Sequence, residues 1–359
     1  MDQAAMIEAL RDLVEAESYS EDPEGVARCG GVIDRLCRDL LGSGPEAIGP
    51  HRLWRRAGPR PVLLLCHFDT VWPTGTLRDF PFSVEDGVAR GPGTFDMKAG
   101  IVQALAAVRE TEGPVSILFT GDEEIGSPTS RELIEAQART ARAVLVLEPA
   151  AGRAVKAARK GVGQWTIEVT GRAAHPGLAP EAGINAAVEL ARQVLAVERV
   201  ARPEEGTTVT VTTLHAGTAP NVVPEEARCT IDVRMWTEEE GQRVARELAA
   251  LRPVLEGARL DVRGALNRGP LERSASEGLY RRLVALGYDL PAAEVGGASD
   301  GNFTAALGVP TLDGLGPVGG GAHARDEHVL VAEMPRRAEM VAALILDLVA
   351  DAPDRPADG

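Results

Sequence analysis

The chain has 359 residues, with 38 Lys and Arg against 53 Asp and Glu and a formal net charge of -15 at pH 7. A polypeptide of this length exceeds the usual size of one domain, so two domains are expected. The acidic balance argues against nucleic acid or an anionic membrane as a partner, because both require a basic patch. A small-molecule or peptide substrate is expected instead.

The cysteines and the N-terminal segment predict a reduced protein of the cytoplasm. Residues 1–18 alternate acidic and apolar positions with helical period and lack the basic start of a signal peptide. No stretch approaches the roughly 18 apolar residues that a membrane span requires. The cysteines show no CxxC spacing, so we expect thiols in the core and not a disulfide framework. They are Cys29, Cys37, Cys66 and Cys229.

The N-terminal part of the chain alternates expected helices and strands, which predicts a mostly parallel sheet. The apolar run at 61–66 has the length and continuity of a strand buried on both faces. The expected elements are helices within 1–41, a loop with a weak edge strand within 45–61, strands at 61–66, 115–120 and 143–147, an irregular connection at 71–96, and helices at 97–110 and 132–141.

A different pattern begins near Lys160. Its strands alternate with period two, and the order β-α-β-β-α-β is typical of a ferredoxin-like antiparallel sheet with helices on one face. The pattern of the first part resumes afterwards. We therefore predict an α/β fold with one domain formed by residues 1–159 and 269–359 and a smaller α+β domain inserted at 160–268. Residues 353–359 are expected to be disordered.

Candidate functional residues follow the ends of the expected parallel strands. His67 and Asp69 follow the first strand, and alternate side chains in extended backbone share a face. Glu123 and Glu124 follow the second strand, and Glu148 follows the third. Ligands of open parallel sheets bind beyond the carboxyl ends of the strands, so these side chains are expected to lie close together.

Asp96 and His323, each in a glycine-containing loop, complete a candidate metal centre. Two histidines with several carboxylates and no thiolate suit a catalytic zinc site, or manganese or cobalt, better than a structural zinc. The number of ligands fits two divalent metal ions, with one carboxylate bridging them at roughly 3.5–4 Å. Three simpler interpretations remain open: a helix N-cap for Asp96, a strand-end cap for Asp69, and a solvated acidic turn for the adjacent glutamates.

Ordered motifs extend over nearly the whole chain. They include HFDTVWP, GPGTFDMKAG, TGDEEIGS, GRAAHPG, PNVVP, GGASDGN and GGGAHARDEHV. In order and spacing these motifs resemble the M20 metallopeptidases, and most closely their glutamate carboxypeptidase branch. The resemblance implies a zinc hydrolase that cleaves the amide bond to a C-terminal amino acid. It also implies that the inserted domain acts as a lid and dimerisation surface.

The resemblance also implies roles for individual side chains. Glu123 is the implied general base, which takes a proton from the attacking water and delivers it to the leaving amine. Asp69 is implied to accept the remaining N–H of His67 and so to fix its tautomer. The implied metal ligands are His67 and His323, one for each ion, Asp96 bridging both, Glu148 completing one site and Glu124 the other.

Three residues of the inserted domain match the family's substrate contacts. His175 is implied to donate a hydrogen bond to the oxyanion in the active site of the neighbouring subunit. Asn221 and Arg234 are implied substrate contacts, and Arg234 could hold a free carboxylate by a bidentate pair. The simpler alternatives are an exposed loop histidine and, for Arg234, a surface salt bridge.

The predicted substrate is a small N-acyl amino acid or peptide with a free carboxylate, and the predicted assembly is a homodimer through the inserted domain. One alternative is an N-acyl-amino-acid deacylase of the acetylornithine deacetylase or succinyl-diaminopimelate desuccinylase type. Another is an inactive metal-bound protein that binds amino acids or peptides, which the presence of Glu123 argues against. A third is a structural protein with a single metal ion.

Overall fold

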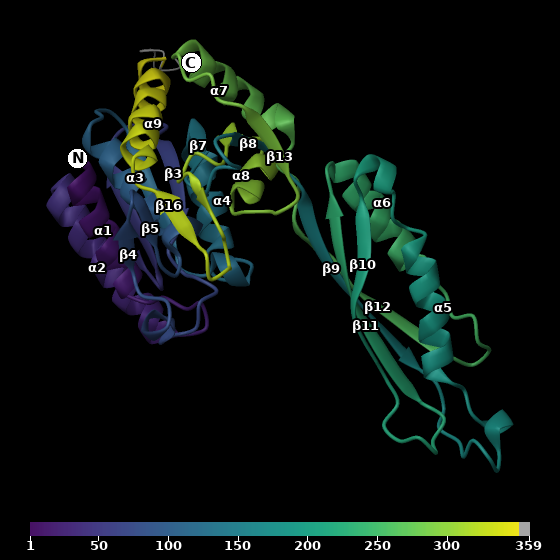
Figure 1. The fold of residues 1–359 in the computed structure, drawn as a ribbon. Helices are drawn as coiled ribbons and strands as arrows, with labels where there is room; N and C mark the ends of the chain where they lie inside the picture. Colours follow the sequence, from purple (N-terminus) through teal and green to yellow (C-terminus); the bar gives the residue numbers. More distant parts are fainter. Residues whose placement is uncertain (352–359) are drawn as a thin grey trace. The chain divides into compact units, whose positions relative to one another are not determined.

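The computed structural model describes residues 1–351, which form two compact units (Figure 1). The disorder predicted for 353–359 lies outside the described residues. Within residues 1–351, the helices are too short or too polar for any of them to cross a membrane. The first unit comprises Met1–Ala158, Leu271–Val295 and Ser299 onward, and the second comprises Arg159–Pro270 with Gly296–Ala298.

The first unit is built on a six-stranded sheet with the order β1-β2-β6-β3-β7-β14. The pairs among β6, β3, β7 and β14 are parallel, which confirms the predicted α/β class with a mostly parallel sheet. Where the sequence predicts one weak edge strand, β1 and β2 form an antiparallel extension of the sheet. The strands are β1 (Glu46–Ile48), β2 (His51–Arg56), β3 (Val62–His67), β6 (Val115–Thr120), β7 (Ala143–Val146) and β14 (Thr311–Leu312).

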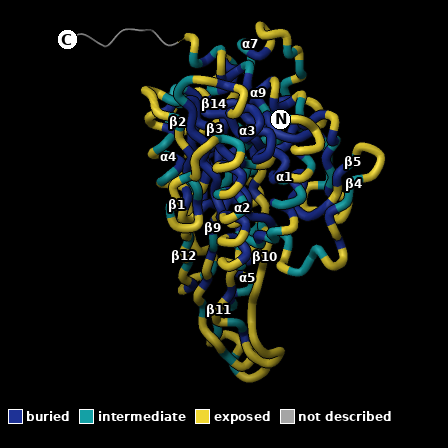
Figure 2. Tube along the Cα trace, turned by 90° about the vertical axis from the view of Figure 1, so that its left-hand side faces the viewer, coloured by how far each residue is buried: buried dark blue, intermediate teal, exposed yellow. Residues whose placement is uncertain are grey.

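Helices cover both faces of this sheet, which explains the continuous apolar sequence of β3. Leu64 and Cys66 pack into one core with residues of α1, α2, α3 and α9, whereas Leu63 and Leu65 pack into another with residues of α4 and α8. Every residue of β3 is therefore buried (Figure 2). The helices are α1 (Gln3–Glu15), α2 (Pro23–Leu41), α3 (Ala99–Arg109), α4 (Arg131–Thr140), α8 (Gly301–Ala306) and α9 (Glu333–Ala350).

The connection after β3 is more regular than its sequence predicts. Asp86 and Gly87 both have positive φ, of 51° and 76°, and form the two-residue turn that favours a β-hairpin. The hairpin joins a small sheet with the order β15-β16-β5-β4, so this connection packs beside a C-terminal loop. The other strands and α-helices of the first unit are β4 (Ser83–Glu85), β5 (Val88–Arg90), α7 (Arg273–Ala285), β13 (Ala292–Val295), β15 (Gly319–Gly320) and β16 (His328–Leu330), together with β8 (Val155–Arg159), whose last residue belongs to the second unit.

The second unit is an antiparallel sheet with the order β10-β11-β9-β12, which is the predicted ferredoxin-like arrangement. The side chains of β9 alternate, with Trp165, Ile167 and Val169 in the core and Glu168 exposed. Helices α5 and α6 contribute to that core, since Leu190 and Val244 lie in the same cluster. The elements are β9 (Gly161–Thr170), α5 (Ala186–Glu198), β10 (Thr208–Ala216), β11 (Glu226–Met235), α6 (Glu238–Ala249) and β12 (Arg259–Arg268).

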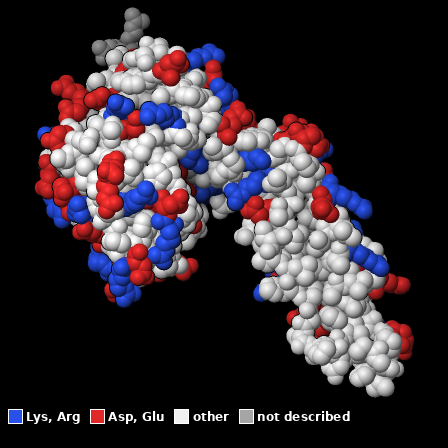
Figure 3. Space-filling model, in the orientation of Figure 1, with Lys and Arg blue, Asp and Glu red and all other residues white. Residues whose placement is uncertain are grey.

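The surface charges of the first unit are mixed. On the face drawn in Figure 3, acidic and basic side chains of the described residues are interspersed, with no continuous basic stripe. Ion pairs such as Arg35–Asp12 and Arg282–Asp347, each at 2.7 Å, contribute to this pattern.

Candidate metal centre

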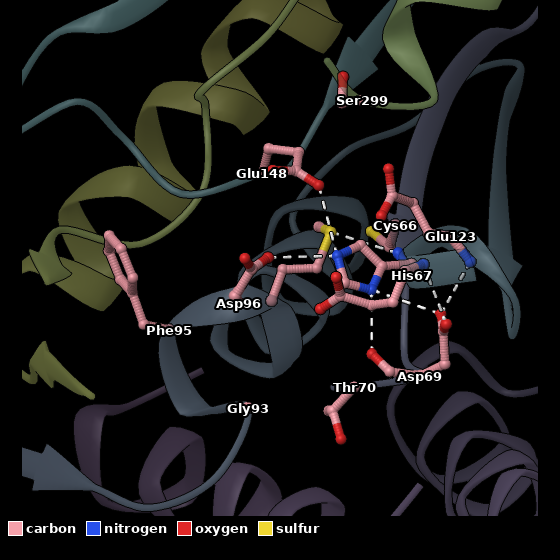
Figure 4. Close-up of polar contacts among 12 residues, drawn as sticks. Cys66, His67, Asp69, Thr70, Gly93, Phe95, Asp96, Glu123, Glu148 and Ser299 are labelled. Carbon is pink, nitrogen blue, oxygen red and sulfur yellow. Dashed lines mark hydrogen bonds and ion pairs between the residues drawn. The ribbon is translucent and has the colours of Figure 1, made fainter. Parts of the chain in front are cut away.

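Side chains from several segments of the first unit meet beyond the carboxyl ends of β3, β6 and β7. His67 is the last residue of β3, Asp96 lies in the irregular turn Thr94–Lys98 before α3, and Glu148 follows β7. His67 Nε2 lies 3.2 Å from Asp96 Oδ1 and 3.3 Å from Glu148 Oε1 (Figure 4). One histidine and two carboxylates thus face a common point at this edge of the sheet.

His323 approaches the same aspartate from the C-terminal loop. Its Nε2 lies 3.4 Å from Asp96 Oδ2 and 3.3 Å from Glu124 Oε1. The two carboxylate oxygens of Asp96 therefore face different histidines. An aspartate between two histidines has the geometry of a ligand that two cations can share.

Two groups of three residues have ligand atoms close enough to hold one metal ion. His67, Asp96 and Glu124 form one group, and His67, Glu123 and Glu148 form the other, with the ligand atoms of each within 4.8 Å of one another. His67 belongs to both groups. A carboxylate oxygen of Glu123 lies within 4.8 Å of the ligand atoms of both His67 and Glu148. The division of ligands between two ions that the family resemblance implies therefore stays a prediction.

The electrostatics of the cluster fit a divalent cation. Glu124 Oε1 is buried and lies 3.3 Å from His323 Nε2. Hydrogen bonds to Asp96 and Glu124 raise the pKa of His323 to about 10. Burial disfavours a charged His67, yet hydrogen bonds to the surrounding carboxylates hold its pKa well above its ordinary value. A site that stabilises positive charge and offers nitrogen and oxygen donors is able to bind a divalent metal ion.

Asp69 is fully buried and organises the acidic turn. Its Oδ1 accepts the N–H of Glu123 at 3.1 Å, and its Oδ2 accepts the N–H of Glu124 at 3.1 Å and the hydroxyl of Ser20 at 2.7 Å. His67 Nδ1 lies 3.1 Å from the backbone oxygen of Asp69 but 3.5 Å from its carboxylate. The carboxylate thus holds the glutamate turn more closely than it holds the imidazole.

The structure rules out two of the simpler interpretations. Helix α3 is preceded by Lys98, which makes no side-chain capping hydrogen bond, so Asp96 is not its N-cap. The glutamates after β6 do not form a solvated turn, since Glu123 is 9% exposed and the Glu124 side chain is also 9% exposed. These carboxylates are buried beside histidines, where an uncompensated charge is costly.

The three predicted substrate contacts lie in the second unit. His175 is exposed, and its Nδ1 accepts the N–H groups of Gly177 and Leu178, which leaves the proton on Nε2 available for donation. Asn221 is also exposed. Their contacts to a substrate stay predictions.

Arg234, the third of these residues, is half-buried and paired with Asp232. Its Nε and one terminal nitrogen donate to the two carboxylate oxygens of Asp232 at 2.9 and 3.0 Å. The salt bridge considered as the simpler alternative is therefore present. It leaves N–H groups of the guanidinium beyond those two bonds, so a substrate role for Arg234 stays a prediction.

Two residues that the sequence did not single out touch this centre. Ser20 donates to the Asp69 carboxylate, and Glu327 accepts the backbone N–H of Asp96 at 3.0 Å. A serine in a polar turn and an acid in a glycine-rich loop are usually solvated. The only sequence signal for Glu327 is its place in the motif that contains His323, four residues further along the chain.

Known proteins match the chain along nearly its whole length, and two family models match parts of its second half. The family described as the peptidase dimerisation domain matches residues 157–254, and peptidase family M20/M25/M40 matches residues 265–347. Carboxypeptidase G2 from Pseudomonas sp. strain RS-16 is 32% identical over 376 residues, which cover 97% of this chain and 90% of that protein. A succinyl-diaminopimelate desuccinylase from Dechloromonas aromatica is 30% identical, covering 88% of this chain and 92% of its own.

Solved structures show the same fold at lower identity. Aminopeptidase PepT from Bacillus cereus has a TM-score of 0.74 at 21% identity and covers 97% of this chain and 99% of its own. The metallo-carboxypeptidase Sso-CP2 from Sulfolobus solfataricus has a TM-score of 0.71 at 16% identity, with coverage of 98% and 100%. The family models and the 32% identity along 97% of the chain show that this protein belongs to the M20 metallopeptidase family and is a hydrolase of that family.

Proposed function

We propose that this enzyme hydrolyses the amide bond to a C-terminal amino acid with two divalent metal ions, zinc or, alternatively, cobalt or manganese. The observation that carries the proposal is the position of Asp96 between two histidines, each of which also faces a glutamate. The proposed ligands are His67, Asp96 and Glu148 for one ion, and His323, Asp96 and Glu124 for the other.

The proposed mechanism uses Glu123 to move one proton. Bound ions would polarise the scissile carbonyl and lower the pKa of the attacking water. The Glu123 carboxylate accepts a proton from that water as its oxygen attacks the carbonyl carbon. Glu123 then donates this proton to the amine nitrogen as the C–N bond breaks, which yields a carboxylic acid and a free amine. Asp69 holds the backbone N–H of Glu123 and so fixes the turn that carries this carboxylate.

In this proposal the first unit carries the catalytic residues and the second unit acts as a lid and dimerisation surface. The match of residues 157–254 to a peptidase dimerisation domain supports the dimer. His175 would donate Nε2–H to the oxyanion in the active site of the neighbouring subunit, and Asn221 and Arg234 would bind the substrate. The cytoplasmic location expected from the sequence stays a prediction.

The substrate class has two candidates, which follow the names of the related proteins. Carboxypeptidase G2 points to release of a C-terminal amino acid such as glutamate, whereas the succinyl-diaminopimelate desuccinylases point to removal of an acyl group from an amino acid. Both reactions break an amide with the same chemistry, so the pocket for the acyl group decides between them. The higher identity to carboxypeptidase G2 favours the first candidate.

The experiment assays a panel of N-acyl amino acids and folate-like glutamate conjugates for release of free amino acid, with zinc or cobalt added. We expect the wild type to bind two ions per chain and to release amino acid from the glutamate conjugates. Glu123→Gln should keep both ions and lose about 100- to 10,000-fold in kcat, the usual contribution of general acid–base catalysis.

The matched control is Glu132→Gln, which neutralises an exposed glutamate in the first turn of α4. It should keep both metal binding and turnover. Retained turnover in Glu123→Gln would refute the base assignment. Faster turnover of succinyl or acetyl amino acids would favour the deacylase, and substrate binding without turnover by the wild type would favour an inactive binding protein.

A further inference from the structure

The carboxylate of Glu327 is fully buried and accepts four hydrogen bonds from N–H groups. Its Oε1 accepts the backbone N–H of Phe95 at 2.9 Å and that of Asp96 at 3.0 Å. Its Oε2 accepts the backbone N–H of Gly93 at 3.0 Å and the indole N–H of Trp72 at 2.7 Å. Two donors on each oxygen suit an ionised carboxylate, which accepts at both oxygens and donates at neither.

These contacts join three segments that carry proposed metal ligands. Trp72 lies in the connection that begins just after His67. The turn that carries Asp96 supplies the three backbone donors, whose residues are all labelled in Figure 4. Glu327 itself lies in the loop that carries His323. Asp96 and Glu327 are 231 residues apart in the sequence, so one side chain connects distant parts of the chain at this site.

The loop that carries His323 needs a contact elsewhere in the structure to hold its conformation. His323 has a φ of 62°, in the left-handed region that non-glycine residues adopt only when the surrounding structure holds them there. Its side chain is 51% exposed, so packing restrains it little. Two successive turns span residues 321–327 and connect His323 to Glu327. The N–H of Ala324 donates to Gly321 O, and the N–H of Glu327 donates to Ala324 O, both at 2.9 Å.

We propose that Glu327 is a positioning residue that fixes Asp96 relative to His323 and thereby sets the affinity for the metal ion that these two residues share. The inference rests on the proposed function, because it assumes that both residues bind metal. His67 ends β3 and Glu148 lies two residues after β7, so the central sheet positions both of them, whereas Glu327 holds the turn of Asp96 and lies in the loop of His323. Loss of Glu327 should therefore affect one ion more than the other.

The test is Glu327→Gln in the full chain, with Zn²⁺ binding to metal-free protein measured by competition with a chromophoric chelator. A glutamine amide can accept at its oxygen, but its NH₂ group would face two N–H donors. We expect one of the two sites to lose about tenfold or more in affinity, as changes to groups that orient metal ligands usually cause. The other site should change by less than about threefold.

Glu189→Gln is the matched control for a merely structural effect. Glu189 lies in the second unit, is also fully buried, and accepts the N–H groups of Val254 and Leu255 and the amide of Gln193. This variant should unfold at a lower temperature than the wild type and bind Zn²⁺ as the wild type does at both sites.

Trp72→Phe provides a second, milder variant in case Glu327→Gln does not fold. It removes one of the four donors and should weaken the same site in the same direction, by less than Glu327→Gln does. Unchanged affinities, or equal losses at both sites, in the folded variants would overturn the assignment of Glu327. A wild type that does not bind two Zn²⁺ ions would instead overturn the proposed function on which the assignment rests.

Discussion

Several carboxylates of this chain are buried, and the groups around each one decide its charge and whether it can bind a cation or holds the backbone. Asp69 and Glu327 accept backbone N–H groups, so their oxygens are already occupied by donors of the protein. Burial disfavours a charged Asp96, but hydrogen bonds from His323 and His67 hold its pKa well below the ordinary value. Burial instead raises the pKa of Glu124. Carboxylates that face histidines are the ones available to a cation, whereas those that face N–H groups hold the backbone.

Glu240, in the first turn of α6, shows how an ion pair makes stability depend on pH. Its carboxylate accepts Arg243 Nε at 2.7 Å and a second Arg243 nitrogen at 2.8 Å, and Thr207 donates at 2.8 Å. The hydrogen bonds from Arg243 lower the pKa of Glu240 from its ordinary value of 4.5 to about 2. A carboxyl group whose pKa is lower in the folded than in the unfolded protein stabilises the fold at pH values above its unfolded-state pKa. This contribution is lost as the pH falls from about 4.5 towards 2.

We therefore expect Glu240→Gln to lower the free energy of unfolding by roughly 1.5–3 kcal/mol at pH 7, the range for hydrogen bonds to a charged group. The difference from the wild type should shrink between about pH 4.5 and pH 2. Chemical unfolding at several pH values measures it. Glu239→Gln removes an exposed charge from the same helical turn and should change stability little. A deficit of Glu240→Gln that is independent of pH would contradict the ion-pair explanation.

At the scale of elements, the close approach of α3 to the end of β7 positions two of the proposed ligands. A Cβ atom at Gly100, in α3, would lie 2.2 Å from the backbone oxygen of Leu147, which no real contact allows. Glycine at this position therefore permits the helix to pack directly against the segment before Glu148. The same helix follows the turn that carries Asp96, so its position affects both residues.

Gly100→Ala should push α3 away from Leu147, destabilise the first unit by about 1–3 kcal/mol, as overpacking typically does, and weaken metal binding. Gly31→Ala is the control, because Gly31 lies inside α2 and a Cβ there would meet nothing within 4 Å. Because alanine loses less backbone entropy than glycine when the chain folds, that variant should be more stable by roughly 0.5–1 kcal/mol. Urea unfolding and zinc titration of both variants measure the effects, and a shift of the same sign in both would contradict this explanation.

At the scale of the whole molecule, the second unit offers a free sheet edge for assembly. Strand β10 lies at one end of the sheet order, and within the described part of the chain it pairs only with β11. Leu214 on this strand is 52% exposed. An exposed edge with apolar side chains can pair with a second copy of the same strand across a two-fold axis. This edge is our candidate for the dimer contact implied by the match to a peptidase dimerisation domain.

We expect the protein to sediment at twice the 37.9 kDa mass of the chain. Leu214→Lys should shift it towards the monomer, because two-fold symmetry places the new charges close together. Val254→Lys introduces the same charge at a residue that is 59% exposed and lies outside the strands, so it should remain dimeric. Analytical ultracentrifugation distinguishes the two, and a dimer that persists in Leu214→Lys would place the contact elsewhere.

The sequence alone determined the features that depend on local periodicity and on motif order. The apolar run of β3 predicts a strand buried on both faces, and the alternation in β9 predicts a sheet with one covered face, because side-chain direction repeats every two residues in a strand. The turn signal of Asp86 and Gly87 was also present in the sequence, although the surrounding segment is too polar to predict strands.

Only the tertiary structure decided which polar side chains are buried together. Asp96 could cap a helix by its sequence position, and packing places it between His67 and His323 instead. Glu327 has the sequence of a solvated loop acid, yet it is fully buried because the N–H groups that compensate its charge come from a turn 231 residues away. The burial of a charge depends on partners brought together by the complete fold, and local pattern does not encode those partners.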